Sequence, residues 1–145
     1  MASLMGEFRH AIDDKGRLTL PARIRDGLGQ IFVATKGLDS CLFLFPQAEW
    51  EGFEARARAL PVTNRDARAY VRLLFSGASE CRVDAQGRVL LPAPLREYAE
   101  LGREGLVIGV LNRAEVWAPE AWERYRADTE SASGEIAERM GALGL

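Results

Sequence analysis

The sequence predicts an α+β fold in which one structural unit occurs twice, with the two copies related by a pseudo-two-fold within the chain. Residues 12–25 read Ile-Asp-Asp-Lys-Gly-Arg-Leu-Thr-Leu-Pro-Ala-Arg-Ile-Arg, and residues 83–96 repeat this stretch with seven of fourteen positions identical. A Trp-Glu pair also recurs, at Trp50 and again at Trp122, an offset of 72 residues. Self-similarity over both halves indicates duplication. In each half, alternating apolar residues are followed by residues at helical spacing, which favours strands and helices together.

Each copy begins with the pattern Asp-x-x-Gly-Arg, which predicts a tight turn between two strands. Gly16 and Gly87 can adopt the positive φ of such a turn, and the carboxylates of Asp13 and Asp84 can accept hydrogen bonds from nearby backbone N–H groups. Apolar residues alternate on both sides of the turn. We therefore expect β-hairpins over residues 6–12 and 17–20, and over residues 80–83 and 88–91.

Prolines mark where several helices should begin. The proline after each hairpin closes the strand and predicts a short helix, over residues 22–28 and 94–101. Alternating apolar runs predict strands over residues 31–35, 41–45, 106–111 and 115–117. Longer helices are predicted from Pro46, from Thr63 or Asn64 to Ser76, and from Pro119. These elements divide the chain into a first repeat (5–60), a connecting helix (61–77), a second repeat (78–130) and a flexible or weakly helical tail (131–145).

The charge is unevenly distributed along a chain whose formal net charge is −2. Residues 1–25 hold five Lys or Arg against three acids, and residues 82–96 hold three Arg against one acid, so each motif segment carries +2. Residues 97–145 hold five basic against ten acidic residues, which gives −5. The basic charge therefore gathers around the repeated turns.

Several functional classes are disfavoured by the residues present. No apolar run approaches the roughly 20 residues of a membrane span, and the first residues lack the basic and apolar regions of a signal peptide, so we expect a cytoplasmic protein. Cys41 and Cys81 lie in apolar, strand-like stretches without partners at metal-ligand spacing, which predicts buried free thiols. Because the sequence holds no nucleophile paired with a base and no phosphate-binding Gly-rich loop, we expect neither catalysis nor a metal or cofactor site.

Arg17 and Arg88 directly follow the turn glycines, which places each guanidinium on an exposed shoulder of its hairpin. There the planar group could reach phosphate oxygens or the edge of a guanine. The alternative is that each arginine pairs only with the aspartate four residues before it. The sequence leaves both interpretations open, although recurrence of the Asp-Arg pair in two diverged copies favours a function.

The two motifs resemble the pair of D-x-x-x-R motifs in the MraZ family of bacterial transcriptional regulators, which is related to the AbrB-type swapped-hairpin DNA-binding proteins. The resemblance covers essentially residues 5–126, although Ile24 stands where the family usually has an aromatic residue. It implies that the two halves interleave as a duplicated swapped-hairpin β-barrel with flanking helices, and that subunits close into a ring. It also implies promoter-DNA contacts by Asp13, Lys15, Gly16, Arg17, Asp84, Gln86, Gly87 and Arg88.

We therefore expect a sequence-specific, nucleoid-associated regulator of the bacterial division and cell-wall gene cluster. Its partners would be double-stranded DNA with repeated promoter elements, and further copies of itself in a homo-oligomeric ring. A segment of charge +2 on an acidic subunit cannot neutralise many phosphates alone, so several subunits would have to bind together. The alternative is an antitoxin-like protein-interaction module without DNA binding of its own.

Overall fold

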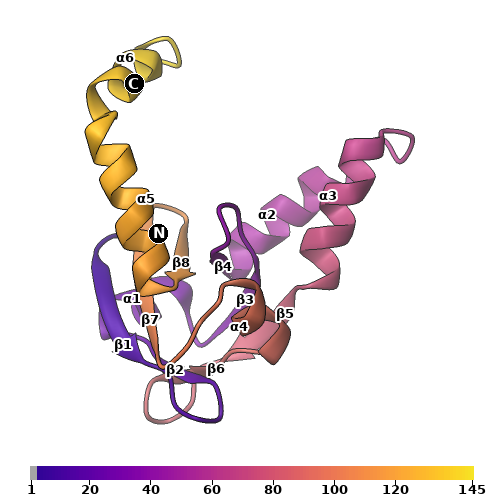
Figure 1. Ribbon diagram of the computed structural model, residues 1–145. Helices are drawn as coiled ribbons and strands as arrows, with labels where there is room; N and C mark the ends of the chain where they lie inside the picture. Colours follow the sequence, from indigo (N-terminus) through magenta and orange to yellow (C-terminus); the bar gives the residue numbers. More distant parts are fainter. Residues whose placement is uncertain (1–2) are drawn as a thin grey trace.

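The computed structural model describes residues 3–145 and shows an α+β fold, as predicted (Figure 1). Most elements lie within two residues of their predicted bounds. In chain order they are β1 (Glu7–Ala11), β2 (Arg17–Thr19), α1 (Ala22–Leu28), β3 (Ile31–Lys36), β4 (Leu42–Pro46), α2 (Gln47–Arg58), α3 (Arg65–Ser76), β5 (Ser79–Arg82), β6 (Arg88–Leu90), α4 (Ala93–Tyr98), β7 (Glu104–Val110), β8 (Arg113–Trp117), α5 (Pro119–Ser131) and α6 (Ser133–Gly141).

The strands of the two halves interleave. A six-stranded sheet has the order β1-β7-β8-β4-β3-β5, and a second, two-stranded sheet pairs β2 with β6. All of these pairs are antiparallel. If each strand is exchanged for its counterpart in the other half, the six-stranded order is the same read backwards, and β2-β6 maps onto itself. The strand topology therefore has the pseudo-two-fold that the sequence repeat predicts.

The hairpin prediction is right about the turns and wrong about the ladders. β1 pairs with β7 of the other half, and β2 pairs with β6. In the described part of the chain, the strands on either side of a turn are joined by no ladder, but by the single bridges Ile12↔Leu18 and Val83↔Val89. An isolated two-stranded hairpin is marginally stable because it buries little apolar surface. Crossing to the other half places Leu18 opposite Val89, and both are fully buried.

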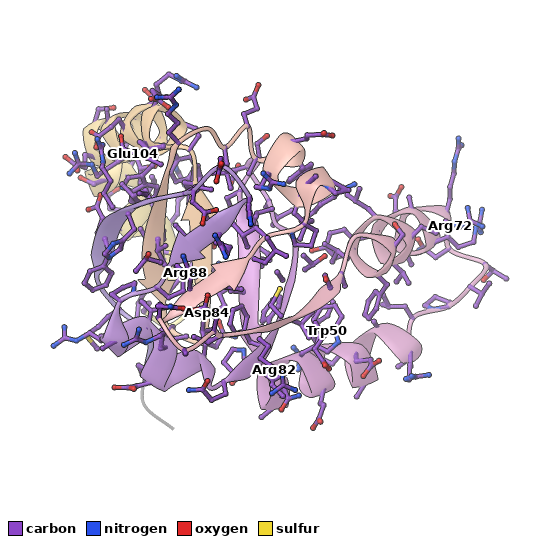
Figure 2. All side chains as sticks on the ribbon, turned by 90° about the horizontal axis from the view of Figure 1, so that it is seen from below. Trp50, Arg72, Arg82, Asp84, Arg88 and Glu104 are labelled. Atoms are coloured by element: carbon purple, nitrogen blue, oxygen red, sulfur yellow. The ribbon has the colours of Figure 1, made fainter. Side chains whose placement is uncertain are left out.

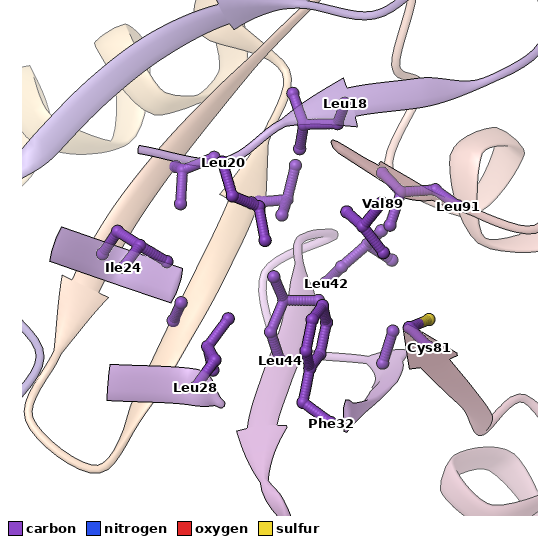
Figure 3. Close-up of a cluster of buried hydrophobic side chains, with 14 of the residues drawn as sticks. Leu18, Leu20, Ile24, Leu28, Phe32, Leu42, Leu44, Cys81, Val89 and Leu91 are labelled. Carbon is purple, nitrogen blue, oxygen red and sulfur yellow. The ribbon is translucent and has the colours of Figure 1, made fainter. Parts of the chain in front are cut away.

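The main hydrophobic core draws on both halves (Figure 3). Side chains from β2, α1, β3 and β4 meet side chains from β5, β6 and the segment after β6, among them Leu18, Leu20, Ile24, Phe32, Leu44, Cys81, Val89 and Leu91. Neither half has a complete core of its own, so the halves are expected to fold as one unit. Within residues 3–145 no ladder closes the six-stranded sheet on itself, and the closed barrel stays a prediction.

Two helical arms project from the side of the molecule opposite the β2-β6 ladder (Figure 1). In the first arm, α2 and α3, the Asn64 side chain caps α3 by accepting from the Ala67 N–H at 2.9 Å, which decides between the two predicted caps. Aromatic rings join its helices, with Trp50 and Phe75 centroids 4.9 Å apart. The second arm, α5 and α6, packs on the sheet through Trp122 against Trp117 at 5.2 Å.

Cys41 and Cys81 are buried and free, as predicted. Burial raises the pKa of the Cys81 thiol to about 11 and raises that of Cys41 further, so both thiols stay protonated at neutral pH. Across residues 3–145, no helix is both long enough and apolar enough to cross a bilayer.

Candidate nucleic-acid interface

The first turn, residues 13–17, is closed by the side chain of Asp13. Its Oδ1 accepts the backbone N–H of Lys15 at 3.0 Å and that of Arg17 at 2.9 Å. Its Oδ2 accepts a hydrogen bond from Nε of Arg17 at 2.6 Å. Gly16 has φ +89°, the positive value for which a glycine was expected. One carboxylate thus shapes the backbone and orients the guanidinium at the same time.

The second turn, residues 84–88, repeats this geometry. Oδ1 of Asp84 accepts the N–H groups of Gln86 and Arg88, both at 2.9 Å, and Oδ2 accepts from Nε of Arg88 at 3.0 Å. Gly87 has φ +77°. Each arginine therefore pairs with the aspartate four residues before it in both copies. Because this hydrogen bond engages Nε, the aspartate of the same turn does not occupy the Nη donors of the guanidinium.

The same contacts keep both aspartates ionised. The backbone N–H of Arg17 is the main cause that lowers the pKa of Asp13 to about 2, and burial opposes it, while the Arg17 side chain and the Lys15 N–H make smaller contributions that lower the pKa further. The corresponding N–H and side chain of Arg88 lower the pKa of Asp84. At neutral pH Asp13 and Asp84 are each a carboxylate beside the guanidinium of their own turn, and the charges of each pair cancel.

The β2-β6 ladder brings the two turns to one end of the molecule, far from the helical arms (Figure 1). Arg17 lies opposite Leu90, and Thr19 lies opposite Arg88. Viewed onto this end, Asp84 and Arg88 lie together near the middle of the face (Figure 2). All eight residues for which the sequence resemblance implies DNA contacts are thus gathered at one end.

The free hydrogen-bonding capacity differs between the two arginines. Within residues 3–145, the Nη groups of Arg17 make no hydrogen bond. Nη2 of Arg88 donates to Oε1 of Gln86 at 3.3 Å, so the neutral Gln86 side chain of the second turn already occupies one Nη donor of this arginine. The two side chains remain 32% and 27% exposed, which leaves donors of both guanidiniums open to a ligand.

Two further arginines belong to this end of the molecule, although they were not predicted as site residues. A Cβ added to Gly16 would lie 2.5 Å from Cζ of Arg96, and a Cβ added to Gly87 would overlap the guanidinium of Arg25. Arg25 and Arg96 are the last residues of the repeated motif, so each covers the turn of the opposite half. Because an arginine occupies this position in both copies, the sequence could have marked Arg25 and Arg96 as candidate site residues. Only the fold shows that each side chain lies against the turn of the opposite half.

Comparisons with known proteins match both halves of the chain. A family model described as "MraZ protein, putative antitoxin-like" matches twice, over residues 3–73 and 74–142, with the division inside α3. "Transcriptional regulator MraZ" of Desulforamulus reducens is 56% identical over 136 residues, covering 94% of this chain and 96% of the relative. The protein of the same name from Pelotomaculum thermopropionicum is 55% identical over 141 residues, covering 97% of each chain.

Proposed function

The chain belongs to the MraZ family, and from this premise we propose that it is a sequence-specific DNA-binding transcriptional regulator of the bacterial division and cell-wall gene cluster. Two matching Asp-Arg turns, joined by the β2-β6 ladder at one end of the molecule, are the main support for this function. Its relatives are named as transcriptional regulators rather than as enzymes. We place its activity in the cytoplasm, at the nucleoid.

The turns are suited to reading DNA because their arginines are oriented before a ligand arrives. Asp13 and Asp84 hold Arg17 and Arg88 by Nε, so that Nη donors can contact guanine O6 and N7 or a phosphate. Fixing the side chain in advance lowers the entropy lost on binding. In this proposal the other contacts come from the turn residues Lys15, Gly16, Gln86 and Gly87.

We also propose that the β2-β6 sheet and the six-stranded sheet together form the core of a swapped-hairpin barrel. Side chains of both sheets already share one hydrophobic cluster, with Leu18 and Val89 of the small sheet contributing alongside Leu44 and Val107 of the large one. A rigid core of this kind would hold the two turns at a constant separation, as two adjacent contacts on one duplex require.

One subunit offers too few contacts for tight binding, so we propose a ring in which repeated promoter elements are bound together. The arms support head-to-tail contacts between copies. The first arm, residues 47–76, holds five Arg against four acids, whereas the second, residues 119–141, holds six acids against three Arg. The first arm also exposes the apolar side chains of Leu60, Val62, Tyr70 and Leu73. The first arm of one copy packed on the acidic second arm of the next would be a heterologous contact, and such contacts can close into rings.

The test is a titration of full-length protein against DNA from upstream of its own gene, with a shuffled duplex of equal length as the control. Both duplexes are measured at two salt concentrations, because charge-driven binding depends on salt. We expect a preference for the upstream DNA that persists near physiological salt. Equal affinity for the two duplexes would refute sequence-specific regulation.

A second candidate function is suggested by the description of the family, which includes the words "antitoxin-like". In that case the protein would act as an interaction module, with its acidic C-terminal segment covering a basic partner. A tight complex with one other protein, together with no affinity for duplex DNA, would favour this function over the regulator.

A further inference from the structure

The two Asp-Arg turns supply oriented hydrogen-bond donors but little net positive charge. Arg17 lies 2.6 Å from Asp13, and Arg88 lies 3.0 Å from Asp84, so each guanidinium has an ionised partner. Attraction to the phosphate backbone depends instead on cations that the protein does not neutralise itself. Lys15 of the first turn has the acidic Asp14 next to it in the sequence, so further cations have to come from the other basic residues at the same end of the molecule.

Arg25 and Arg96 lie against the turns of the opposite halves. Arg25 comes from α1 and Arg96 from α4, and their guanidiniums occupy the space where Gly87 and Gly16 would otherwise carry a side chain. Backbone hydrogen bonds also join each turn to the opposite half. The Leu91 N–H donates to the Gly16 carbonyl at 3.0 Å, and the Leu20 N–H donates to the Gly87 carbonyl at 2.9 Å.

Neither arginine forms an ion pair with a carboxylate of residues 3–145. Arg96 donates from Nε to the Leu91 carbonyl at 3.0 Å, which fixes its direction without neutralising its charge. Both side chains are half-buried, where a cation without a counter-charge is less well solvated than on an open surface. A phosphate oxygen would supply the missing negative charge.

We propose that Arg25 and Arg96 contact DNA phosphates, each beside the turn of the opposite half. This inference rests on the DNA-binding function proposed above. Each turn then presents two arginines with different tasks. Its own arginine, Arg17 or Arg88, offers oriented donors with its charge cancelled, while the arginine from the other half contributes uncancelled charge. Phosphate contacts of this kind hold the protein in register and carry no sequence information themselves.

The experiment measures binding of full-length Arg25→Gln, Arg96→Gln and double variants to the upstream and shuffled duplexes by fluorescence anisotropy over a salt series. We expect affinity to fall by the same factor for both duplexes, because a phosphate contact is common to all sequences. The slope of log affinity against log salt should decrease by about 0.9 for each phosphate that a subunit no longer neutralises. An unchanged slope, or a weakening confined to the upstream duplex, would overturn the proposal.

Lysine variants separate charge from packing. Arg25→Lys and Arg96→Lys keep the charge but lack the planar group that covers the glycine. A phosphate role requires these variants to keep the wild-type salt slope, and a slope as low as that of the glutamine variants would overturn it. If the glutamine variants do not fold, the lysine variants decide alone. Arg9→Gln, an exposed change on β1 outside the two turns and both arms, is the control and should leave the slope unchanged.

Failure of this inference can be told from failure of the proposed function. If Arg17→Ala abolishes the preference for upstream DNA while the glutamine variants bind like wild type, only the phosphate role of Arg25 and Arg96 is wrong. If wild-type protein binds both duplexes equally and weakly, the regulator function falls and this inference falls with it.

Discussion

Nη1 of Arg88 lies 3.8 Å from Oδ2 of Asp13, so the arginine of the second half reaches the carboxylate of the first. Arg88 thereby has three acceptors around it, Asp84, Gln86 and the more distant Asp13. Among residues 3–145, Arg17 has only Asp13 as a side-chain acceptor, through Nε. The two turns share one geometry, but their arginines are not equally free to bind a ligand.

We predict that Arg17→Ala weakens DNA binding more than Arg88→Ala does. Arg17 has the freer guanidinium and stands beside the cationic Lys15, whereas Arg88 is partly held by neutral Gln86. A contact to guanine should cost about 1 to 3 kcal/mol per site and relax sequence preference. The measurement is anisotropy with the upstream duplex and with single-base variants of it.

Folding should be little affected by these two substitutions, because a part-exposed ion pair contributes about 0 to 1 kcal/mol to stability. Arg58→Ala removes another arginine paired four residues away, with Glu54, and should likewise leave the stability unchanged. If Arg17→Ala melted the protein while affinity per folded subunit persisted, Arg17 would be a structural partner of Asp13 only.

We predict that Gly16→Val destabilises the protein and abolishes binding. A β-branched residue is strongly disfavoured at φ +89°, at a cost on the order of 1 to 3 kcal/mol, and its Cβ would also displace the Arg96 guanidinium. Thermal unfolding monitored by circular dichroism measures the destabilisation. Gly102→Ala is the control, since Gly102 has no neighbouring atom within 4 Å of an added Cβ and no positive φ.

The two contributions at Gly16 can be separated with alanine. Gly16→Ala in an Arg96→Ala background removes the clash and keeps the backbone strain. We expect the double variant to be less destabilised than the sum of the single variants. Additive effects would show that Arg96 does not pack against this turn in solution.

We predict that the contribution of Asp13 to stability depends on pH only in the acid range. Its pKa falls from an ordinary 3.8 to about 2 on folding, so the ionised side chain stabilises the folded state above about pH 4. That contribution should fade as the pH falls from about 4 through 2, where the folded protein also takes up the proton. The difference in melting temperature between wild type and Asp13→Asn should follow this course, and a difference that persists unchanged below pH 2 would contradict it.

We predict that the purified protein is a closed oligomer whose assembly requires the first arm. Leu73→Glu places a carboxylate on an exposed apolar position of α3 and should reduce the particle to smaller species in light scattering. Arg9→Gln, an exposed change on β1 outside both arms, should leave the size unchanged. A monomeric wild-type protein at micromolar concentration would refute the ring and the multivalent account of affinity.

Features that depend on neighbouring residues were predictable. The positive φ of Gly16 and Gly87, the Asp-Arg pairing in both turns and the short helix Ala22–Leu28 all follow from interactions within a few residues. The sequence also located the candidate site, because duplication repeated the same turn chemistry. It did not select Arg25 or Arg96, since nothing near them in the chain shows that their side chains end on a turn about 60 to 80 residues away.

The duplication, the turns and the apolar alternation of the strands can all be read from the amino-acid sequence. The turns and strand ends are local properties, set by glycine conformation, by aspartate hydrogen bonding and by proline. The family resemblance implied that the halves interleave, but the residues themselves do not specify which strands pair, because an alternating strand can bury the same face in a local hairpin or in a ladder with the other half. The ladder between β2 and β6 is the outcome, since it covers Leu18 and Val89 with each other. The same ladder brings the two turns together, and the candidate DNA-binding face exists only because the halves exchange partners.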